Sequence, residues 1–215
     1  MNRSAFFAAV RSSLFRGSLT QSQVDGMSAI LTEFERRRLP VDHTAYMLAT
    51  AYHETAMHMQ PVIETRLPNE AENPSVDTAI ARLENSWARG RMPWVKSPYW
   101  RKDAQGRSYL GRGLPQLTHK VNYDRVGKMI DVDLLSDPDA ALRTDIAVQI
   151  MIMGMTLGLF TGRKLGDFLD GADEADAEDY REFRNARVII NGTDKADVIA
   201  GVAVKFEKAL RPARL

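Results

Sequence analysis

The sequence predicts a mainly α-helical protein with at most one short β-hairpin. Apolar side chains recur with helical spacing over most of the chain. The 215 residues are 44% hydrophobic, which is enough to bury a substantial core. We find no internal repeat, low-complexity segment or linker, so we expect a single domain over residues 1–215.

The helical segments follow one another with short breaks. Thr20 or Ser22 is expected to cap the second helix, and three arginines end it before Pro40. A long apolar helix over residues 139–160 is expected to form the central core, with the side chains of Ile146, Ile150, Met153 and Leu157. The expected helices are residues 3–15, 21–38, 43–59, 76–89, 120–130, 139–160, 163–170, 177–190 and 194–211.

The third helix is almost free of charge. It is expected to start behind Asp42, a plausible N-cap, and to end near Met59 because Pro61 cannot continue it. From Ala45 to Gln60 the only formally charged side chain is Glu54, although the whole chain is 27% charged. Such scarcity predicts a helix that is buried on most sides.

A carboxyl on this helix is a candidate catalytic group. Ala45, Leu48, Ala49, Tyr52 and Ala56 would form one apolar stripe, and Glu54 would project from the opposite side with no cation on its own helix. Desolvation without a partner raises a carboxyl pKa and would let this residue act as a general acid. The alternative is a buried ion pair with an arginine from elsewhere in the chain.

A second carboxylate, Glu64, follows ten residues later. Pro61 should fold it back on a loop, where it could face Glu54 across a cleft. His53, Glu54 and His58 resemble the zinc signature HExxH, but histidines five apart on a helix point about 140° apart and cannot share a metal ion. We therefore expect no metal and no cofactor.

Residues 90–113 lose helical periodicity and read as a long basic loop. Trp94, Tyr99 and Trp100 would either stack on sugar rings or plug the loop onto the core. The DAQG turn at 103–106 suggests a two-stranded element around 99–110. Seven cations stand against Asp103 alone between Trp87 and Arg112: Arg89, Arg91, Lys96, Arg101, Lys102, Arg107 and Arg112.

Charge and composition exclude several classes of protein. The 29 basic and 28 acidic residues give a net charge of +1, so nucleic-acid binding through residues 87–112 is not favoured. No apolar run reaches the ~20 residues of a membrane span, and no export signal is recognised at the N-terminus. The absence of cysteine suits a protein made in a reducing cytoplasm.

Three segments carry a resemblance to a known family: AYHET at 51–55, YLGRGLPQLTHKVNY at 109–123 and RVIINGTDKA at 187–196. In order and spacing they resemble glycoside hydrolase family 19 over residues 45–200, especially its cysteine-free endolysin branch from phages and prophages. The resemblance implies a lysozyme-like, two-lobed helical fold. Leu110 departs from it, since the chitinases commonly have a second aromatic there, and so does the lack of the plant enzymes' disulfides and several of their loops.

The resemblance also implies roles for individual residues. Glu54 corresponds to the general acid and Glu64 to the general base, with Glu70 or Glu72 as fallback, and Thr118 would help to hold the attacking water. Because Glu64 is expected on a loop beyond Pro61, we expect a wide gap between the two carboxyl groups and therefore inversion of the anomeric centre. Substrate contacts would fall on Tyr109, Gln116, Asn122 and Asn191, and the aromatic loop adds Trp94.

The expected function is therefore endolysin-type hydrolysis of the β-1,4-linked amino-sugar backbone of peptidoglycan. Chitin hydrolysis is the first alternative, and a non-catalytic wall-binding or virion structural module is the second. We expect a monomer that binds peptidoglycan strands, with no nucleic-acid partner and no membrane insertion. It would accumulate in the host cytoplasm and reach the periplasm and cell wall through a separate holin-type partner.

Overall fold

A computed structural model describes residues 1–172 and 176–213 of the chain. Within these residues the protein is mainly α, with eight α-helices and one two-stranded antiparallel sheet, which confirms the predicted fold class and is consistent with a lysozyme-like fold. The chain divides into two compact units, Met1–Gln60 with Met151–Leu215, and Pro61–Ile150, and each is described by itself. The prediction of one domain over residues 1–215 stays a prediction. No described helix has the length and apolar character needed to cross a membrane.

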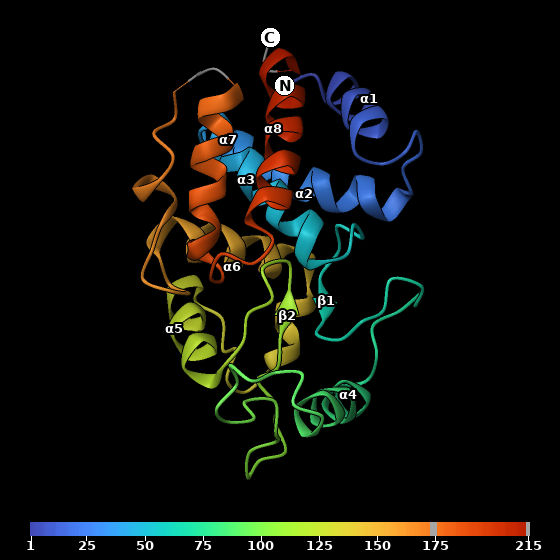
Figure 1. Cartoon of the computed structure of the whole chain (residues 1–215), viewed down its shortest axis with the longest axis vertical. Helices are drawn as coiled ribbons and strands as arrows, with labels where there is room; N and C mark the ends of the chain where they lie inside the picture. Colours follow the sequence, from blue (N-terminus) through green and yellow to red (C-terminus); the bar gives the residue numbers. More distant parts are fainter. Residues whose placement is uncertain (173–175, 214–215) are drawn as a thin grey trace. The chain divides into compact units, whose positions relative to one another are not determined.

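The first unit is a group of helices packed around the C-terminal one. α1, α3 and α7 all contact α8, as Figure 1 shows in the blue, cyan, orange and red parts of the ribbon. Phe206 of α8 stacks on Phe6 of α1, and Tyr46 of α3 stacks on Phe183 of α7. The elements of this unit are α1 (Arg3–Ser13), α2 (Gln21–Arg37), α3 (Val41–Glu54), the short 3-10 helix η2 (Leu165–Asp167), α7 (Asp176–Asn185), the 3-10 helix η3 (Ala186–Ile189) and α8 (Ala196–Ala213).

The ends of α2 follow the sequence prediction, and the start of α3 does not. Thr20 caps α2 in a reciprocal capping box with Gln23, and the helix ends at Arg37 before the left-handed Arg38. α3, however, begins at Val41, and Pro40 occupies the cap position. Asp42 instead lies buried inside the first turn, where its carboxylate accepts hydrogen bonds from the amides of His43 and Gly171.

The helix that carries Glu54 is buried on most sides, as predicted, but it is shorter than expected. α3 ends at Glu54 rather than near Met59. The hydroxyl of Thr55 donates to the carbonyl of Ala51 and accepts the amide of Met59, and this closes the helix end. Ala56, Met57 and Met59 then adopt left-handed backbone angles, so the chain has left the helix before it reaches Pro61.

The second unit holds the small sheet and three helical elements. In the sheet, β1 (Val62–Ile63) pairs antiparallel with β2 (Arg112–Gly113), and Val62 lies opposite Gly113. The helical elements are α4 (Val76–Ala88), α5 (Lys120–Ile130) and the 3-10 helix η1 (Pro138–Leu142), and α6 (Thr144–Leu157) begins in this unit and continues into the first (Figure 1).

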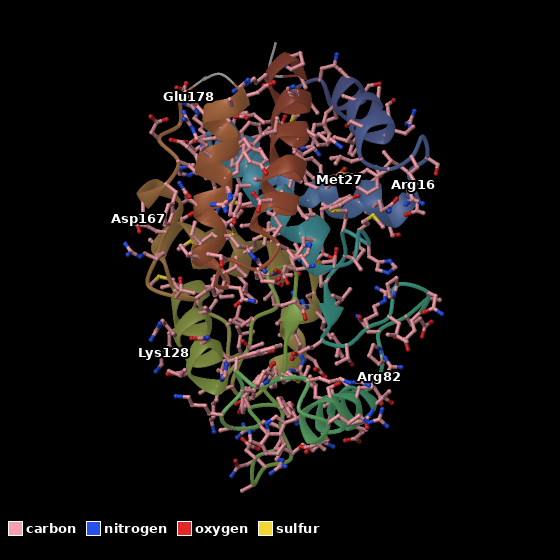
Figure 2. The ribbon with its side chains drawn as sticks, viewed as in Figure 1. Arg16, Met27, Arg82, Lys128, Asp167 and Glu178 are labelled. Carbon is pink, nitrogen blue, oxygen red and sulfur yellow. The ribbon has the colours of Figure 1, made fainter. Side chains whose placement is uncertain are left out.

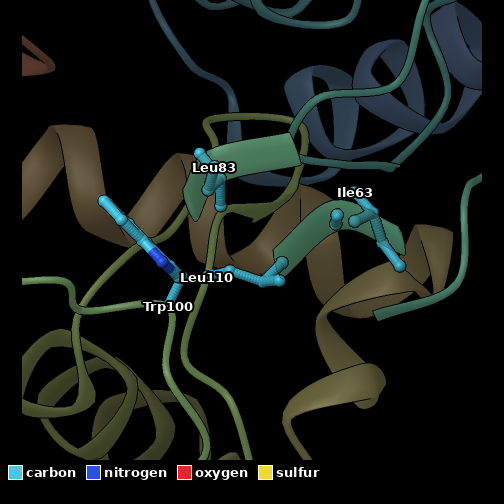
Figure 3. Packing of buried hydrophobic residues seen from close by; sticks show 5 residues of the cluster. Ile63, Leu83, Trp100 and Leu110 are labelled. Atoms are coloured by element: carbon cyan, nitrogen blue, oxygen red, sulfur yellow. The ribbon is translucent and has the colours of Figure 1, made fainter. Parts of the chain in front are cut away.

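The basic loop is fastened to the core of the second unit by one of its tryptophans. Trp100 is fully buried and packs with Ile63, Leu83 and Leu110, as Figure 3 shows. Trp100 therefore plugs the loop onto the core, which is one of the two interpretations. Trp94 is 73% exposed, and its stacking on a sugar ring stays a prediction. The predicted turn is present, because the amide of Gly106 donates to the carbonyl of Asp103, but the strand pair lies at 62–63 and 112–113 rather than around 99–110.

Three predicted helices differ in extent. The segment 139–160 is interrupted at Arg143, between η1 and α6, and Leu157 is exposed rather than part of the core. The segment 163–170 contains only the single turn of η2, and 177–190 is divided into α7 and η3. Hydrophobic periodicity alone does not distinguish one continuous helix from two short helical segments that share an apolar face.

A buried acidic cluster joins α7 and α8 and makes stability depend on pH. Arg211 lies 2.7 Å from Asp179 and 3.3 Å from Glu207, both of which are buried. Burial raises the pKa of Glu207 to about 8, and the nearby charges of Asp179 and Asp42 act in the same direction, against that of Arg211. Folding therefore favours the protonated form of this carboxyl.

We expect the free energy of unfolding to fall as the pH rises. The carboxyl of Glu207 ionises near its ordinary pKa in the unfolded chain but near pH 8 in the folded protein, so its stabilising effect is complete below about pH 4.5 and is lost as the pH rises through 8. Urea unfolding should give a free energy at least ~1 kcal/mol lower at pH 9 than at pH 6, and Glu207→Gln should reduce this difference. Identical profiles for the wild type and the variant would contradict the assignment.

Candidate active site

Glu54 is the last residue of α3 and forms an ion pair with Arg187 of η3. The Nη1 atom of Arg187 lies 2.8 Å from Oε1 of Glu54, and the side chains are 3% and 17% exposed, respectively. The Nε atom of Arg187 donates to the carbonyl of Asp194, which fixes the guanidinium. The prediction of a carboxyl without a cation is therefore wrong, and the ion-pair alternative is confirmed. The partner comes from 133 residues away and could not be seen on the helix itself.

The surroundings of Glu54 are a mixture of buried polar and apolar groups. Tyr46 and Thr50 precede it by two turns and one turn on the same face of α3, and both are fully buried. Burial raises the pKa of the Tyr46 phenol. Burial also lowers the pKa of His53, against the opposing effect of the Glu54 charge, so burial favours a neutral imidazole beside the carboxylate.

The two histidines do not form a helical metal signature. His53 lies on α3, whereas His58 lies on the turn beyond the end of the helix. Among the described residues the one group with metal-ligand spacing is elsewhere, where carboxylate oxygens of Asp42, Asp170 and Glu182 lie within 4.8 Å of one another. Both oxygens of Asp42 already accept backbone amides, which accounts for their orientation without an ion.

Glu64 follows β1 and has a hydrogen-bond donor on each of its carboxylate oxygens. The phenol of Tyr99 donates to Oε1 at 2.6 Å, and the amide of Gly111 donates to Oε2 at 2.8 Å. The amide of Glu64 in turn donates to the carbonyl of Gly111 at 2.8 Å, which extends the β1–β2 pairing by one position. The protein thus orients this carboxylate, and the residue as a whole is half-buried.

The fallback carboxylates are placed differently. Glu70 forms an ion pair with Arg82 (labelled in Figure 2) and accepts the amide of Leu67. These contacts lower the pKa of Glu70 to about 2, and the hydrogen bond from Arg82 has the largest effect. Glu72 is exposed. The carboxylate of Glu70 therefore stabilises the loop that contains it and is already paired with a cation. Glu64 is the better candidate for a general base.

The segment that contains Thr118 folds into a tight hairpin. Arg112 and Leu117 exchange backbone hydrogen bonds of 3.2 and 2.9 Å, and the amide of His119 donates to the carbonyl of Tyr109. The half-buried Thr118 lies between these positions, on the strand that runs back past Gly111. The hairpin thus places Thr118 in the same local structure as the amide that holds Glu64.

Gln116 and Tyr109, two of the predicted substrate contacts, are engaged inside the protein. The side-chain amide of Gln116 donates to the carbonyls of Val62 and Gly113 and so fastens the two strands together. Tyr109 is 3% exposed, and its hydroxyl lies 3.1 Å from the carbonyl of Leu135. Their assignment as substrate contacts stays a prediction.

The other predicted contacts are more accessible. Asn122 is half-buried in the first turn of α5, and Trp94 is exposed on the basic loop. Asn191 is exposed after η3, and its side-chain oxygen accepts the amide of Gly192. Their assignment as substrate contacts also stays a prediction.

Sequence reasoning did not identify the partners of the two glutamates. Arg187 is the first residue of the third quoted motif, RVIINGTDKA, but nothing in that motif connects it to Glu54. For Tyr99 the sequence suggests only stacking on a sugar ring or plugging of the loop onto the core. A phenol five residues after Trp94 carries no sequence signal that would connect it to Glu64, which is 35 residues away.

The comparisons with known proteins support the family resemblance over part of the chain. Residues 88–155 match the profile of the glycoside hydrolase 19 family, described as chitinase class I. The chain is 50% identical over 52 residues to Chitinase 2 of Oryza sativa subsp. japonica, and 53% identical over 36 residues to Endochitinase 4 of Solanum tuberosum. These matches cover 24% and 17% of this chain, but only 15% and 12% of the relatives. No solved structure matches the chain.

Proposed function

Since residues 88–155 match the glycoside hydrolase family 19 profile, we propose that the chain is a glycosidase of this kind and that it hydrolyses the β-1,4-linked amino-sugar backbone of peptidoglycan. The observation that carries the glycosidase part is the environment of Glu64. Both donors that hold its carboxylate, Tyr99 and Gly111, lie within the segment that matches the family. An oriented, accessible carboxylate is what a general base requires.

The proposed chemistry uses two carboxyl groups. Glu54 donates a proton to the leaving glycosidic oxygen, and Glu64 accepts a proton from the attacking water, which Thr118 helps to hold. Arg187 fixes the orientation of the Glu54 side chain. Attack by water on the face opposite the leaving group would give inversion at the anomeric carbon.

The choice of peptidoglycan is supported by the exposed end of the basic loop. Trp94 is exposed, and so are Arg89, Arg91 and Lys96, which lie within five residues of it in the sequence. Within the described residues, the ion pairs of this region engage Arg101 with Glu84 and Lys102 with Asp77, and leave those three cations without an acidic partner. An aromatic face with free cations suits a glycan that carries carboxylates.

Chitin hydrolysis is the second candidate, and the names of the plant relatives favour it. The deciding measurement is the release of reducing sugar from purified peptidoglycan and from colloidal chitin, with Glu54→Gln as the blank. Faster release from peptidoglycan supports the proposal, and faster release from chitin replaces it with the second candidate. Binding to either polymer without release would indicate a non-catalytic wall-binding or structural module.

We expect activity on peptidoglycan to depend on salt. Raising the ionic strength from 20 to 200 mM shortens the screening length to about 7–8 Å and should lower the initial rate several-fold, with a much smaller effect on neutral chitin oligomers. Substituting Arg89, Arg91 and Lys96 by glutamine should remove most of the dependence.

A matched control removes three cations that are paired with acids elsewhere: Lys128→Gln, Arg181→Gln and Lys208→Gln. It has the same net charge as the loop variant and should keep the salt dependence of the wild type. Equal profiles for the two triple variants would show that net charge, rather than the loop, determines the response.

The biological setting is part of the same proposal. An endolysin role, accumulation in the host cytoplasm and release through a holin-type partner all extend from the resemblance. Lysis of cells from within only when a membrane-permeabilising protein is co-expressed would support this setting. Unaided export of the chain expressed alone would contradict it.

A further inference from the structure

We infer that Tyr99 is a positioning residue for Glu64, and that position 111 must be glycine for the same reason. This inference rests on the proposed function, because it assigns Glu64 the role of general base. The evidence is a group of contacts inside the second unit that the family resemblance did not assign: the phenol of Tyr99 and the amide of Gly111 each hold one oxygen of the carboxylate, at 2.6 and 2.8 Å.

The phenol acts as a donor. Burial and the adjacent charge of Glu64 raise the pKa of Tyr99, so its hydroxyl stays protonated over the working range of the protein. Hydrogen bonds from neutral donors stabilise the ionised form of a carboxyl group. Tyr99 thus orients one oxygen of Glu64 without placing a positive charge beside it.

The tyrosine ring is itself held in place. Its centroid lies 4.4 Å from the centroid of the His119 ring. It lies 5.0 Å from the centroid of the Trp100 ring, which it meets edge-on. His119 has a left-handed backbone with φ of +67°, and its amide is tied to the carbonyl of Tyr109. Packing lowers the pKa of His119, which favours a neutral imidazole against the phenol. The donor is therefore fixed by an anchored tryptophan and a constrained histidine.

The second donor depends on the absence of a side chain. A Cβ atom at Gly111 would lie 3.1 Å from Oε2 of Glu64 and 2.9 Å from Oε1 of Gln116. Both are closer than ordinary van der Waals contact, and one neighbour is the carboxylate itself. Any larger residue at this position would push Glu64 away from the amide that holds it. Since φ at Gly111 is not in the left-handed region, the requirement comes from space rather than from backbone conformation.

This arrangement leaves room for catalysis. An ionised carboxylate has about four lone-pair directions, and the two donors use two of them. The remaining directions are available to the proton of a water molecule. With both oxygens tied, the carboxylate cannot rotate about its terminal bond, so the free lone pairs keep one orientation during turnover.

The test is Tyr99→Phe, which keeps the ring and its packing but removes the hydroxyl. We expect kcat on peptidoglycan to fall about tenfold with KM within about twofold, because the lost contact orients a reacting group and does not bind substrate. Thermal unfolding measured in parallel should show a melting temperature close to that of the wild type, because the ring and its packing are kept. Tyr180→Phe is the matched control, because its hydroxyl also lies within hydrogen-bond distance of a carboxylate, that of Asp197.

The outcomes separate this inference from the proposed function. An active wild type, an inactive Glu64→Gln and a Tyr99→Phe variant with unchanged kcat would overturn the role of Tyr99 and leave the glycosidase intact. An inactive wild type would remove the proposed function, and with it the basis of the inference. A fall in kcat accompanied by a matching fall in melting temperature and by a raised KM would also overturn it, because a purely structural role predicts that result. Gly111→Ala should cause a larger loss than Tyr99→Phe, and wild-type activity in that variant would contradict the space requirement.

Discussion

Glu54→Gln is expected to abolish turnover, with a loss of about 10³-fold or more in kcat. The amide cannot supply a proton to the leaving oxygen, and the other proposed groups do not replace it. Arg187 would keep a hydrogen-bond acceptor but lose its counter-charge, and an uncompensated buried cation costs stability. Activity should therefore be measured with thermal unfolding, so that lost chemistry is distinguished from lost structure.

The control for this variant is Glu178→Gln (Glu178 is labelled in Figure 2). Glu178 lies on α7 in the same unit, is exposed, and pairs with Arg181 at 3.5 Å, so removing its charge should change neither activity nor stability appreciably. If Glu54→Gln kept a tenth or more of the wild-type rate while folded, the assignment of the general acid would be wrong.

Glu64→Gln is expected to lower kcat by about 10²–10³-fold while the protein stays folded. A glutamine has almost the same shape, and its oxygen can still accept the amide of Gly111. The Tyr99 hydroxyl can rotate and accept from the new NH₂ group, so the hydrogen-bond geometry survives and only the basicity is lost. Steady-state kinetics should show this as a fall in kcat with KM nearly unchanged.

Two results would contradict the proposed base. A wild-type rate for Glu64→Gln would move the role to Glu72 or to Glu70, although Glu70 is already paired with Arg82. A β anomer in the freshly released product, observed by NMR, would contradict inversion even if both glutamates proved essential.

The sequence predicted what local physics determines. Helical periodicity gave most of the helices, Thr20 gave the start of α2, and the lack of charge from Ala45 to Gln60 gave the burial of α3. The prediction was wrong at the end of α3, where one side chain overrides the helical pattern. α3 ends at Glu54, seven residues before Pro61, because the hydroxyl of Thr55 bonds both Ala51 and Met59, and the hydrophobic pattern does not show that bond.

The sequence supplied candidate residues for the site but not their contacts. The quoted motifs supplied Glu54 and Thr118, and the position after Pro61 supplied Glu64, whereas the ion pair with Arg187 and the hydrogen bond from Tyr99 join positions 133 and 35 residues apart. Such pairings depend on how the chain folds back on itself. A helical projection of α3 shows only neighbours on the same helix, and for that reason it suggested a carboxyl without a cation.

Tyr99 and Trp100 are adjacent in the chain but donate to different carboxylates, Glu64 and Glu84. Trp100 also fills the core with Ile63 and Leu83, so any repacking of that core moves the backbone that carries the phenol. A substitution of Ile63 or Leu83 that keeps the unit folded can therefore still displace the donor of Glu64. Attempts to raise the heat resistance of this unit are better directed at its surface helices than at this interior.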